Sequence, residues 1–459
     1  MTVEKYEQIL RTLARITEGT RFHGHVYSVG GCERDRIMGR PIKDIDLVVD
    51  IENGGIDLAK YLHENGYTTT GIVVYENFGT AMFRLKDFPD EEIEVVHTRH
   101  ECYRDPTRRQ PTTGFGTITE DCCRRDFTMN AIYRSVATGQ VFDLTDRGIE
   151  DIKTGTIRAC DNQETIFGED PLRQFRAARF CSQLGFDIEY YTAAGIRKNA
   201  KRIEIVSKER IKTEFDKILE SDRPLVGLDI LMESGLIRYG IPDLERVLSY
   251  KPNVTLIKKC VANMAIDSNC NTNKTLRKNI LLTAMSLGEG GTALNPFMDD
   301  LKYSNDEKDT IADMLRAFRN YQSYEESAHD ISKLRLMQLN LKRTDYESAL
   351  SLVSALGLTV TDKERNNRDM VGYKLPVNGD DIMEITGLKP GKDIGEYLVM
   401  LTDLALHATD MTKEEMLVVV SEDHKHKIQS GEYGKVAAVL DSAGFRKLAL
   451  KIIKRHGNH

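Results

Sequence analysis

The spacing of hydrophobic residues changes character at about residue 150 of this 459-residue chain. Residues 1–20 place apolar side chains at helical spacing and predict a short amphipathic helix. Residues 25–150 alternate short β-type runs with helical segments, and from about residue 150 the pattern is helical with polar and glycine-containing breaks. We therefore expect an α+β protein with a small N-terminal mixed sheet and a helical remainder. The expected strands are Val26–Val29, Asp46–Val49, Gly71–Tyr75, Thr80–Arg84 and Ile93–Val96.

Two glycines in the predicted sheet region are followed, after a short helix, by two aspartates. Gly30 and Gly31 permit a tight turn and close approach of the backbone to a phosphate. The helix expected from about Cys32 would point its N-terminal amides at that phosphate. Asp44 and Asp46 lie two residues apart at the start of a strand and so face the same side, where paired carboxylates suit Mg²⁺. Taken separately, the two glycines are most simply a turn and the two aspartates a solvated strand end. Together, with a helix between them, they favour nucleotide chemistry.

The stretch from Gly30 to Asp46 resembles the signature of the polymerase-beta-like nucleotidyltransferases. It reads Gly-Gly-x-x-Arg-Asp-x-x-x-Gly with Asp-Ile-Asp after it, which is similar to the class II branch. That branch contains the tRNA nucleotidyltransferases (CCA-adding enzymes) and the bacterial poly(A) polymerases. The resemblance implies a nucleotidyltransferase head in which Asp44 and Asp46 hold Mg²⁺ and are catalytic. It also implies that Gly30, Gly31 and Arg34 bind the triphosphate.

The segment Arg124–Ala131 combines two arginines, an aspartate and an asparagine at the expected start of a helix. Arginine supplies paired donors for phosphate oxygens, and asparagine can hydrogen-bond a ribose hydroxyl. A charged, capped helix start is the plainer interpretation. The string is similar to the class II ribose and triphosphate motif, which implies that Asp126 and Asn130 contact the sugar and that Arg124 and Arg125 contact phosphates.

Glu94 lies on the expected strand Ile93–Val96, where its carboxylate could face the aspartate pair. A third carboxylate would complete a two-metal site, so we predict a catalytic role for Glu94. A solvated strand residue is the competing interpretation.

A third group of charged residues begins at Asp170. Asp170 suits a helix N-cap, with Pro171 in the first turn, and this capping role alone would explain the aspartate. Arg173 and Arg176 follow at helical spacing on the same face. The string is similar to the class II Glu-Asp-x-x-Arg motif, which implies that Asp170 and Arg173 read the edge of the incoming base and select C and A over U and G. Arg176 is counted with this nucleotide-binding set.

The C-terminal half carries weaker signals. The segment 375–398 resembles the tail of bacterial-type tRNA nucleotidyltransferases and predicts a helix–turn–helix whose turn residues Lys389, Gly391 and Lys392 bind RNA; an ordinary helix hairpin is the alternative. Many family members carry a metal-dependent phosphohydrolase domain in the middle region. Here Met285 and Ser286 stand where its His-Asp doublet would be, so we expect no phosphatase activity.

Composition narrows the setting. The net charge of −7 argues against a general nucleic-acid coat but not against a local basic cleft. The eight cysteines form no Cys-x-x-Cys pair, which favours reduced thiols in a cytoplasmic protein. We expect no signal peptide, no membrane span and no stable protein partner. A basic amphipathic helix is expected at 445–456, facing either RNA, a partner or solvent.

These interpretations predict an enzyme that adds C and A from CTP and ATP to the 3′ end of tRNA, with Mg²⁺ as cofactor. A poly(A) polymerase, a partial CC-adding or A-adding enzyme, a non-catalytic RNA-binding protein and a nucleotide transfer to a small molecule are the alternatives. The expected domains are a catalytic head, a helical neck with the nucleotide-selecting helix, a degenerate phosphohydrolase-like body and a tRNA-binding tail. Their expected boundaries are 1–150, 151–240, 241–345 and 346–459.

Overall fold

The computed structural model describes residues 1–69, 71–76, 79–102, 112–287 and 296–430. It divides into two compact units, one of residues 1–249 with 296–302, the other of 250–295 with the chain from 303 onward. The first unit contains the whole predicted head and neck. The four-domain division stays a prediction.

A seven-stranded mixed sheet forms the centre of the head, in the order β3-β4-β5-β2-β1-β8-β9. Only β2 and β5 pair in parallel; every other neighbouring pair in this sheet is antiparallel. The strands are β1 Val26–Val29, β2 Ile45–Val49, β3 Val73–Tyr75, β4 Thr80–Phe83, β5 Ile93–His97, β8 Ile132–Ser135 and β9 Val141–Asp143. A separate hairpin pairs β6 Arg99–Cys102 with β7 Thr112–Phe115. All five expected strands are confirmed.

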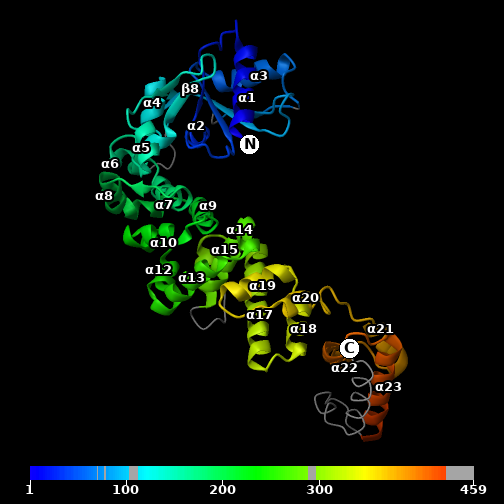
Figure 1. Cartoon of the computed structure of the whole chain (residues 1–459). Coiled ribbons are helices and arrows are strands. Elements are labelled where there is room, and N and C mark those ends of the chain that lie inside the picture. Colours follow the sequence, from blue (N-terminus) through cyan, green and yellow to red (C-terminus); the bar gives the residue numbers. More distant parts are fainter. Residues whose placement is uncertain (70, 77–78, 103–111, 288–295, 431–459) are drawn as a thin grey trace. The chain divides into compact units, whose positions relative to one another are not determined.

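The two faces of the sheet are used differently. Helices α1 (Val3–Thr17) and α3 (Gly54–Glu64) pack on one face, over a core that includes Ile45, Leu47 and Ile93 (Figure 1). Side chains alternate along a strand. The even-numbered residues of β2 and β5 therefore point to the opposite face, which is where the acidic residues of this region are found.

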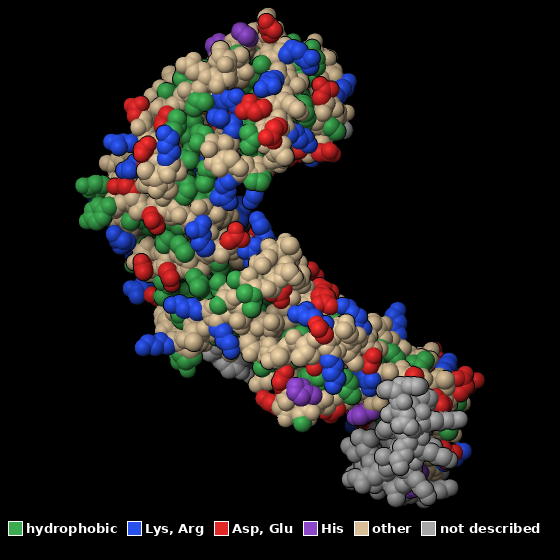
Figure 2. Space-filling view, in the orientation of Figure 1, with side chains coloured by type: hydrophobic (Ala, Val, Ile, Leu, Met, Phe, Trp, Pro, Cys, Tyr) green, Lys and Arg blue, Asp and Glu red, His purple; other side chains and the backbone are tan. Residues whose placement is uncertain are grey.

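The remaining helices of the first unit are divided between the head and the neck. Those of the head are α2 Gly31–Ile37, α4 Ile118–Cys123, the 3-10 turn η2 Thr128–Asn130 and α5 Gly148–Thr154. Those of the neck are α6 Gln163–Glu169, α7 Leu172–Leu184, α8 Tyr190–Asn199, η3 Ala200–Ile205, α9 Lys208–Leu219, α10 Pro224–Glu233, α11 Leu236–Gly240 and α12 Pro242–Ser249. A two-stranded parallel ladder, β10 Thr156–Ile157 with β11 Asp187–Ile188, and helix α16 Pro296–Asp300 complete this unit. Hydrophobic side chains protrude over α8 (Figure 2), where Tyr190 and Tyr191 are exposed.

The described part of the second unit is helical. Its hydrophobic cores include one around Tyr321 and Leu350 and one around Tyr397 and Leu401. Its helices are α13 Lys251–Met264, α14 Ser268–Thr272, α15 Lys274–Leu287, α17 Asn305–Glu326, α18 Ile331–Asn340, α19 Tyr346–Ala355, α20 Asp362–Asn366, α21 Gly379–Thr386, α22 Lys392–His407 and α23 Lys413–Ser430. Among the helices of the described ranges, none combines the length and apolarity needed to cross a lipid bilayer.

Candidate active site

Gly30, Asp46 and Arg125 meet at the start of helix α2. Gly30 has φ 89°, and a Cβ atom added there would lie 3.3 Å from Asp46 Oδ2 and 3.8 Å from Arg125 Nη1. Only glycine accommodates both this backbone conformation and this close approach. Helix α2 begins at the next residue, Gly31, so the turn ends with free helical amides. The predicted turn, helix and carboxylate are therefore brought together in one corner.

The acidic residues gather on strands β2 and β5. Asp46 and Glu94 are direct partners across the parallel β2–β5 pair. Burial raises the pKa of Asp46 to about 6; the negative charges of Glu94 and Asp44 act in the same direction, and Arg125 and Arg176 oppose them. Asp44 lies just before β2 and is exposed. Carboxylates whose mutual repulsion raises a pKa are stabilised by a cation.

The donor set fits a hard divalent cation. Asp44 and Asp46 supply oxygen ligands of the kind that Mg²⁺ prefers. Among the residues that the structure describes, no three His, Cys, Asp or Glu side chains are close enough to enclose a metal ion. The aspartate pair stays the predicted metal site, and a direct part for Glu94 likewise stays a prediction.

The buried carboxylate of Asp121 orients the two adjacent arginines. It accepts hydrogen bonds from Arg124 Nη2 at 2.6 Å, from Arg125 Nη2 at 3.0 Å and from the Tyr133 hydroxyl at 2.7 Å. Burial alone would raise the pKa of Asp121, but Arg125 and Arg124 hold it well below its usual range. Asp121 thus fixes the orientation of Arg124 and Arg125, and Arg125 Nη1 reaches the space beside Gly30.

A chain of hydrogen bonds joins the head to neck helix α7. Arg34 Nη1 donates to Asn130 Oδ1 at 2.8 Å, and Asn130 Nδ2 donates to Asp126 Oδ1 at 3.1 Å. Arg176 Nη2 donates to Asp126 Oδ2 at 2.6 Å. Burial would raise the pKa of Asp126, yet Arg176 and Asn130 lower it to about 2. Four of the predicted nucleotide-binding residues therefore form one connected network.

The prediction that a helix starts within the segment Arg124–Ala131 is wrong. A capping box between Thr117 and Glu120 starts α4 earlier, and that helix ends at Cys123. The chain then forms the short turn η2 and continues directly into β8, which pairs with β1 and β9. Burial of Ile132 and Tyr133 in the sheet outweighs the helical pattern of the preceding residues.

The two proposed base-reading residues are engaged by other protein groups. Asp170 is the C-cap of α6, and Pro171 rather than Asp170 is the N-cap of α7, so the predicted N-cap is wrong by one residue. Asp170 still accepts a backbone hydrogen bond from Leu172 at 3.2 Å and forms an ion pair with Arg210 at 2.8 Å. Arg173 is buried and donates to the backbone carbonyls of Arg124 and Ile166, at 2.5 and 3.1 Å. Their side chains do not hydrogen-bond each other in the described structure.

Sequence reasoning missed residues that support the site from within the core. Glu33 is completely buried on α2 and accepts hydrogen bonds from the Tyr6 and Ser28 hydroxyls and from Arg36 Nε. Asp121 is likewise buried and was missed in the same way. A lone Glu, Asp or Arg within a helical pattern normally indicates a solvated face, so the residue types gave no signal.

The candidate residues predicted for the tail and the body lie in the second unit. Gly391 precedes α22, which Lys392 begins, and Lys389 is exposed in the turn after α21. The predicted helix–turn–helix and its alternative, an ordinary helix hairpin, both have this arrangement, so RNA binding by the turn stays a prediction. Met285 and Ser286 are buried in α15. The expected basic helix at 445–456 lies outside the described residues.

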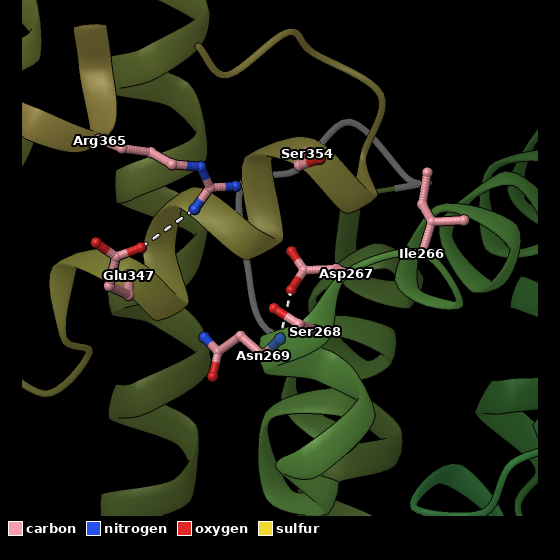
Figure 3. Close-up of a pocket in the computed structure, with 7 residues that line it drawn as sticks. All are labelled: Ile266, Asp267, Ser268, Asn269, Glu347, Ser354 and Arg365. Atoms are coloured by element: carbon pink, nitrogen blue, oxygen red, sulfur yellow. Dashed lines mark hydrogen bonds and ion pairs between the residues drawn. The ribbon is translucent and has the colours of Figure 1, made fainter. Parts of the chain in front are cut away.

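A polar pocket of about 590 Å³ lies between the α13–α14 turn, α19 and α20 of the second unit (Figure 3). An ion pair of 3.1 Å between Glu347 and Arg365 closes one side. No predicted site residue lines this pocket. Its lining residues are Ile266, Asp267, Ser268, Asn269, Glu347, Ser354 and Arg365.

Comparison with known proteins finds two family models that match parts of this chain. Residues 26–158 match the model described as the Poly A polymerase head domain, and residues 185–248 match one described as a probable RNA and SrmB-binding site of polymerase A. The CCA-adding enzyme of Lactococcus lactis subsp. lactis (strain IL1403) is 29% identical over 408 residues, 87% of this chain and 93% of that relative. The CCA-adding enzyme of Lactiplantibacillus plantarum is 36% identical over 224 residues, 48% of this chain and 52% of that relative.

Solved structures show the same fold. A crystal structure of the Bacillus stearothermophilus CCA-adding enzyme in complex with CTP is 25% identical, covers 92% of this chain and 98% of its own, and has a TM-score of 0.70. The Thermotoga maritima CCA-adding enzyme complexed with tRNA is 21% identical, covers 92% and 98%, and has a TM-score of 0.61. The mixed-sheet head and helical remainder are therefore a known architecture.

Proposed function

The chain belongs to the family of tRNA nucleotidyltransferases and poly(A) polymerases, and we propose that it adds C and A nucleotides from CTP and ATP to the 3′ end of tRNA. Relatives named CCA-adding enzymes align with most of its length. The structural neighbours include a CCA-adding enzyme in complex with CTP and one complexed with tRNA. Those ligands match the substrates of the proposed reaction.

The observation that carries the proposal is the corner where Gly30, Asp46 and Arg125 converge. A glycine without a side chain leaves room for a phosphate beside a carboxylate. Arg125 and the amides at the start of α2 provide positive charge and hydrogen-bond donors for that phosphate. A triphosphate with its α-phosphate near Asp46 is the ligand that this combination suits.

In the proposed reaction the RNA 3′-hydroxyl attacks the α-phosphate of CTP or ATP, and pyrophosphate leaves with the electron pair of the broken P–O bond. Mg²⁺ held by Asp44 and Asp46 would supply the charge that activates the hydroxyl and stabilises the leaving group, with Glu94 as a third carboxylate. Arg34, Arg124 and Arg125 bind the triphosphate oxygens. Asp126 and Asn130 position the ribose, and Arg176 holds Asp126 in place.

Base selection is assigned to Asp170 and Arg173. A carboxylate accepts from the amino group of cytosine or adenine, and a guanidinium donates to the ring nitrogen or to cytosine O2. Uracil and guanine lack that pattern. Because Asp170 is paired with Arg210 and Arg173 with backbone carbonyls, we expect both to exchange partners when they read a base.

The remaining assignments follow from the same proposal. Residues 1–150 are the catalytic head, 151–240 the neck, 241–345 the body and 346–459 the tail. Exposed Lys389, Gly391 and Lys392 in the α21–α22 turn bind the tRNA backbone. A cytoplasmic location and reduced cysteines fit an enzyme acting on tRNA.

The test is addition to three tRNAs that end at the discriminator base, at C and at CC. Each is incubated with Mg²⁺ and CTP, ATP or both, and the products are resolved at single-nucleotide length. The proposal predicts C, C and A, followed by arrest. Unlimited A addition would make the chain a poly(A) polymerase, C-only or A-only products a partial enzyme, and no addition would contradict a catalytic function.

A further inference from the structure

Phe180 lies on neck helix α7 where three arginines surround its ring. The guanidinium carbons of Arg179, Arg34 and Arg176 lie 4.2, 5.2 and 5.6 Å from the ring centroid. Phe180 is only 4% exposed, and the side chains of Arg34 and Arg179 are 10% and 12% exposed, so these two contacts are largely screened from water, whereas Arg176 is 36% exposed. The negative face of an aromatic ring attracts cations most strongly when both are desolvated.

The same ring joins the head to the neck. Phe180 packs edge-on against Phe127 of the head, with the ring centroids 5.9 Å apart. Arg34 comes from α2 of the head, while Arg176 comes from α7. One apolar side chain of the neck therefore contacts both a triphosphate-binding candidate and the arginine that holds Asp126.

Each arginine also has a polar partner. Arg34 donates to Asn130 and Arg176 donates to Asp126. Arg179 pairs with Glu214 of α9 at 2.6 Å. Each guanidinium is thus held both by an oxygen and by the Phe180 ring. Without the ring, Arg34 would keep its partners Asn130 and Asp35, but three like charges would lie around an apolar gap and one of the contacts that orient Arg34 would be lost.

We propose that Phe180 is a positioning residue for nucleotide binding, acting through Arg34 and Arg176. The proposal rests on the nucleotidyltransferase function given above. An aliphatic side chain of similar size would fill the space but would offer no ring face to the guanidinium groups. The ring, rather than its volume, is therefore what nucleotide affinity depends on.

The test compares Phe180→Leu, Phe180→Met and Phe180→Tyr in the full-length protein. We expect both aliphatic variants to weaken CTP binding, measured by equilibrium dialysis, by about tenfold, because a desolvated cation–π contact is lost. The KM for CTP should rise in parallel while kcat changes by less than about threefold, since the ring touches no reacting atom. Phe180→Tyr keeps the ring and should restore most of the affinity.

Phe175→Leu is the matched control. Phe175 is fully buried on the same helix and its ring faces Gly240 rather than the site. This variant should lower the melting temperature without changing the Kd for CTP. Equal weakening in Phe175→Leu and Phe180→Leu, or a folded Phe180→Tyr that binds no better than Phe180→Leu, would overturn the proposal.

A double-mutant cycle tests the route of action. Phe180→Leu in an Arg34→Met background should weaken CTP binding by less than about threefold, because contacting residues are not additive. The same tenfold loss in both backgrounds would show that Phe180 does not act through Arg34. Wild-type protein that neither binds CTP nor extends tRNA would refute the proposed function itself, which is distinguishable from a failure confined to Phe180.

Discussion

The phosphate end and the base end of the proposed nucleotide site are built differently. At the phosphate end, Gly30 leaves an open corner beside Asp46 and Arg125, with Arg125 fixed from behind by Asp121. At the base end, Asp170 is paired with Arg210, and Arg173 donates to backbone carbonyls. At the first end the space beside Gly30 is open while Arg125 keeps its partner Asp121, whereas at the second we expect protein contacts to be given up when a base binds.

This contrast suggests a division of labour. Binding energy for a triphosphate is common to all nucleotides, so a preorganised phosphate end provides affinity without discrimination. Discrimination between bases needs protein groups whose hydrogen bonds are completed only by the correct base. If a base displaces the Asp170–Arg210 ion pair, only a base with matching donors and acceptors replaces the contacts that are lost. The predictions below test the phosphate end first, where the largest effects are expected.

Removing the central carboxylate should have the largest effect. Asp46→Ala is expected to lower kcat for CMP addition by about a thousandfold or more, because metal-assisted charge stabilisation is worth several kcal/mol. The measurement is single-nucleotide extension of tRNA at saturating CTP. Asp50→Asn is the control, since Asp50 follows the same strand and accepts from Thr98 at 3.0 Å. Near-normal activity in Asp46→Ala would contradict the assignment of the metal site.

Filling the glycine corner should have the next largest effect. Gly30→Ala places a Cβ 3.3 Å from Asp46 Oδ2 at φ 89°, so the Asp46 carboxylate must shift, while Arg125 Nη1 at 3.8 Å is in ordinary contact. A displacement of this kind costs about a hundredfold in kcat/KM. Gly24→Ala is matched, because Gly24 has φ 81° with no atom within 4 Å of the added Cβ. It should lower stability by about 1 kcal/mol but leave activity intact; equal loss in both would point to backbone strain alone.

At the base end we expect a change in selectivity rather than in rate. Asp170→Asn replaces one acceptor oxygen with a donor and should reduce the preference for CTP over UTP by roughly thirtyfold. Competition between the two nucleotides on one tRNA measures it. Glu164→Gln changes an exposed carboxyl on the neighbouring helix α6 and should leave the ratio unaltered. An unchanged ratio in Asp170→Asn would remove Asp170 from base selection.

The smallest effect concerns stability. Because the pKa of Asp46 is raised to about 6, the folded state binds a proton more tightly than the unfolded state. Stability therefore falls as pH rises from about 4 to about 6 and stays lower above that window. Asp46→Asn should stabilise the metal-free protein at pH 7.5 by about 1 kcal/mol, and the gain should shrink at pH 4.5. Thermal unfolding at both values measures it, and destabilisation at pH 7.5 would contradict the raised pKa.

Local patterns were sufficient to predict much of the head. The glycine turn, helix α2 and the strand carrying Asp46 each depend on residues near in sequence, and all three are present. The strands β8 and β9 were not predicted, because β8 pairs with β1, a partner about one hundred residues away, and β9 in turn pairs with β8. The helical pattern of Arg124–Ala131 predicted a helix at the point where the chain instead leads into β8.

The site residues divide in the same way. Asp46 and Arg125 were named from their motifs, but the buried Asp121 that holds Arg125 carries no such signal. The sequence likewise gives no signal for the proposed role of Phe180, because a phenylalanine at helical spacing predicts only core packing. Residues that act by supporting others become visible only when long-range contacts are known.

The most direct test of the account is a structure of the chain bound to CTP. We expect the triphosphate at Gly30 and Arg125, the Asp170–Arg210 ion pair broken, and the Asp170 carboxylate accepting from the cytosine amino group. A bound CTP whose triphosphate lies away from Gly30, or whose base lies apart from an intact Asp170–Arg210 pair, would contradict the contrast between the two ends.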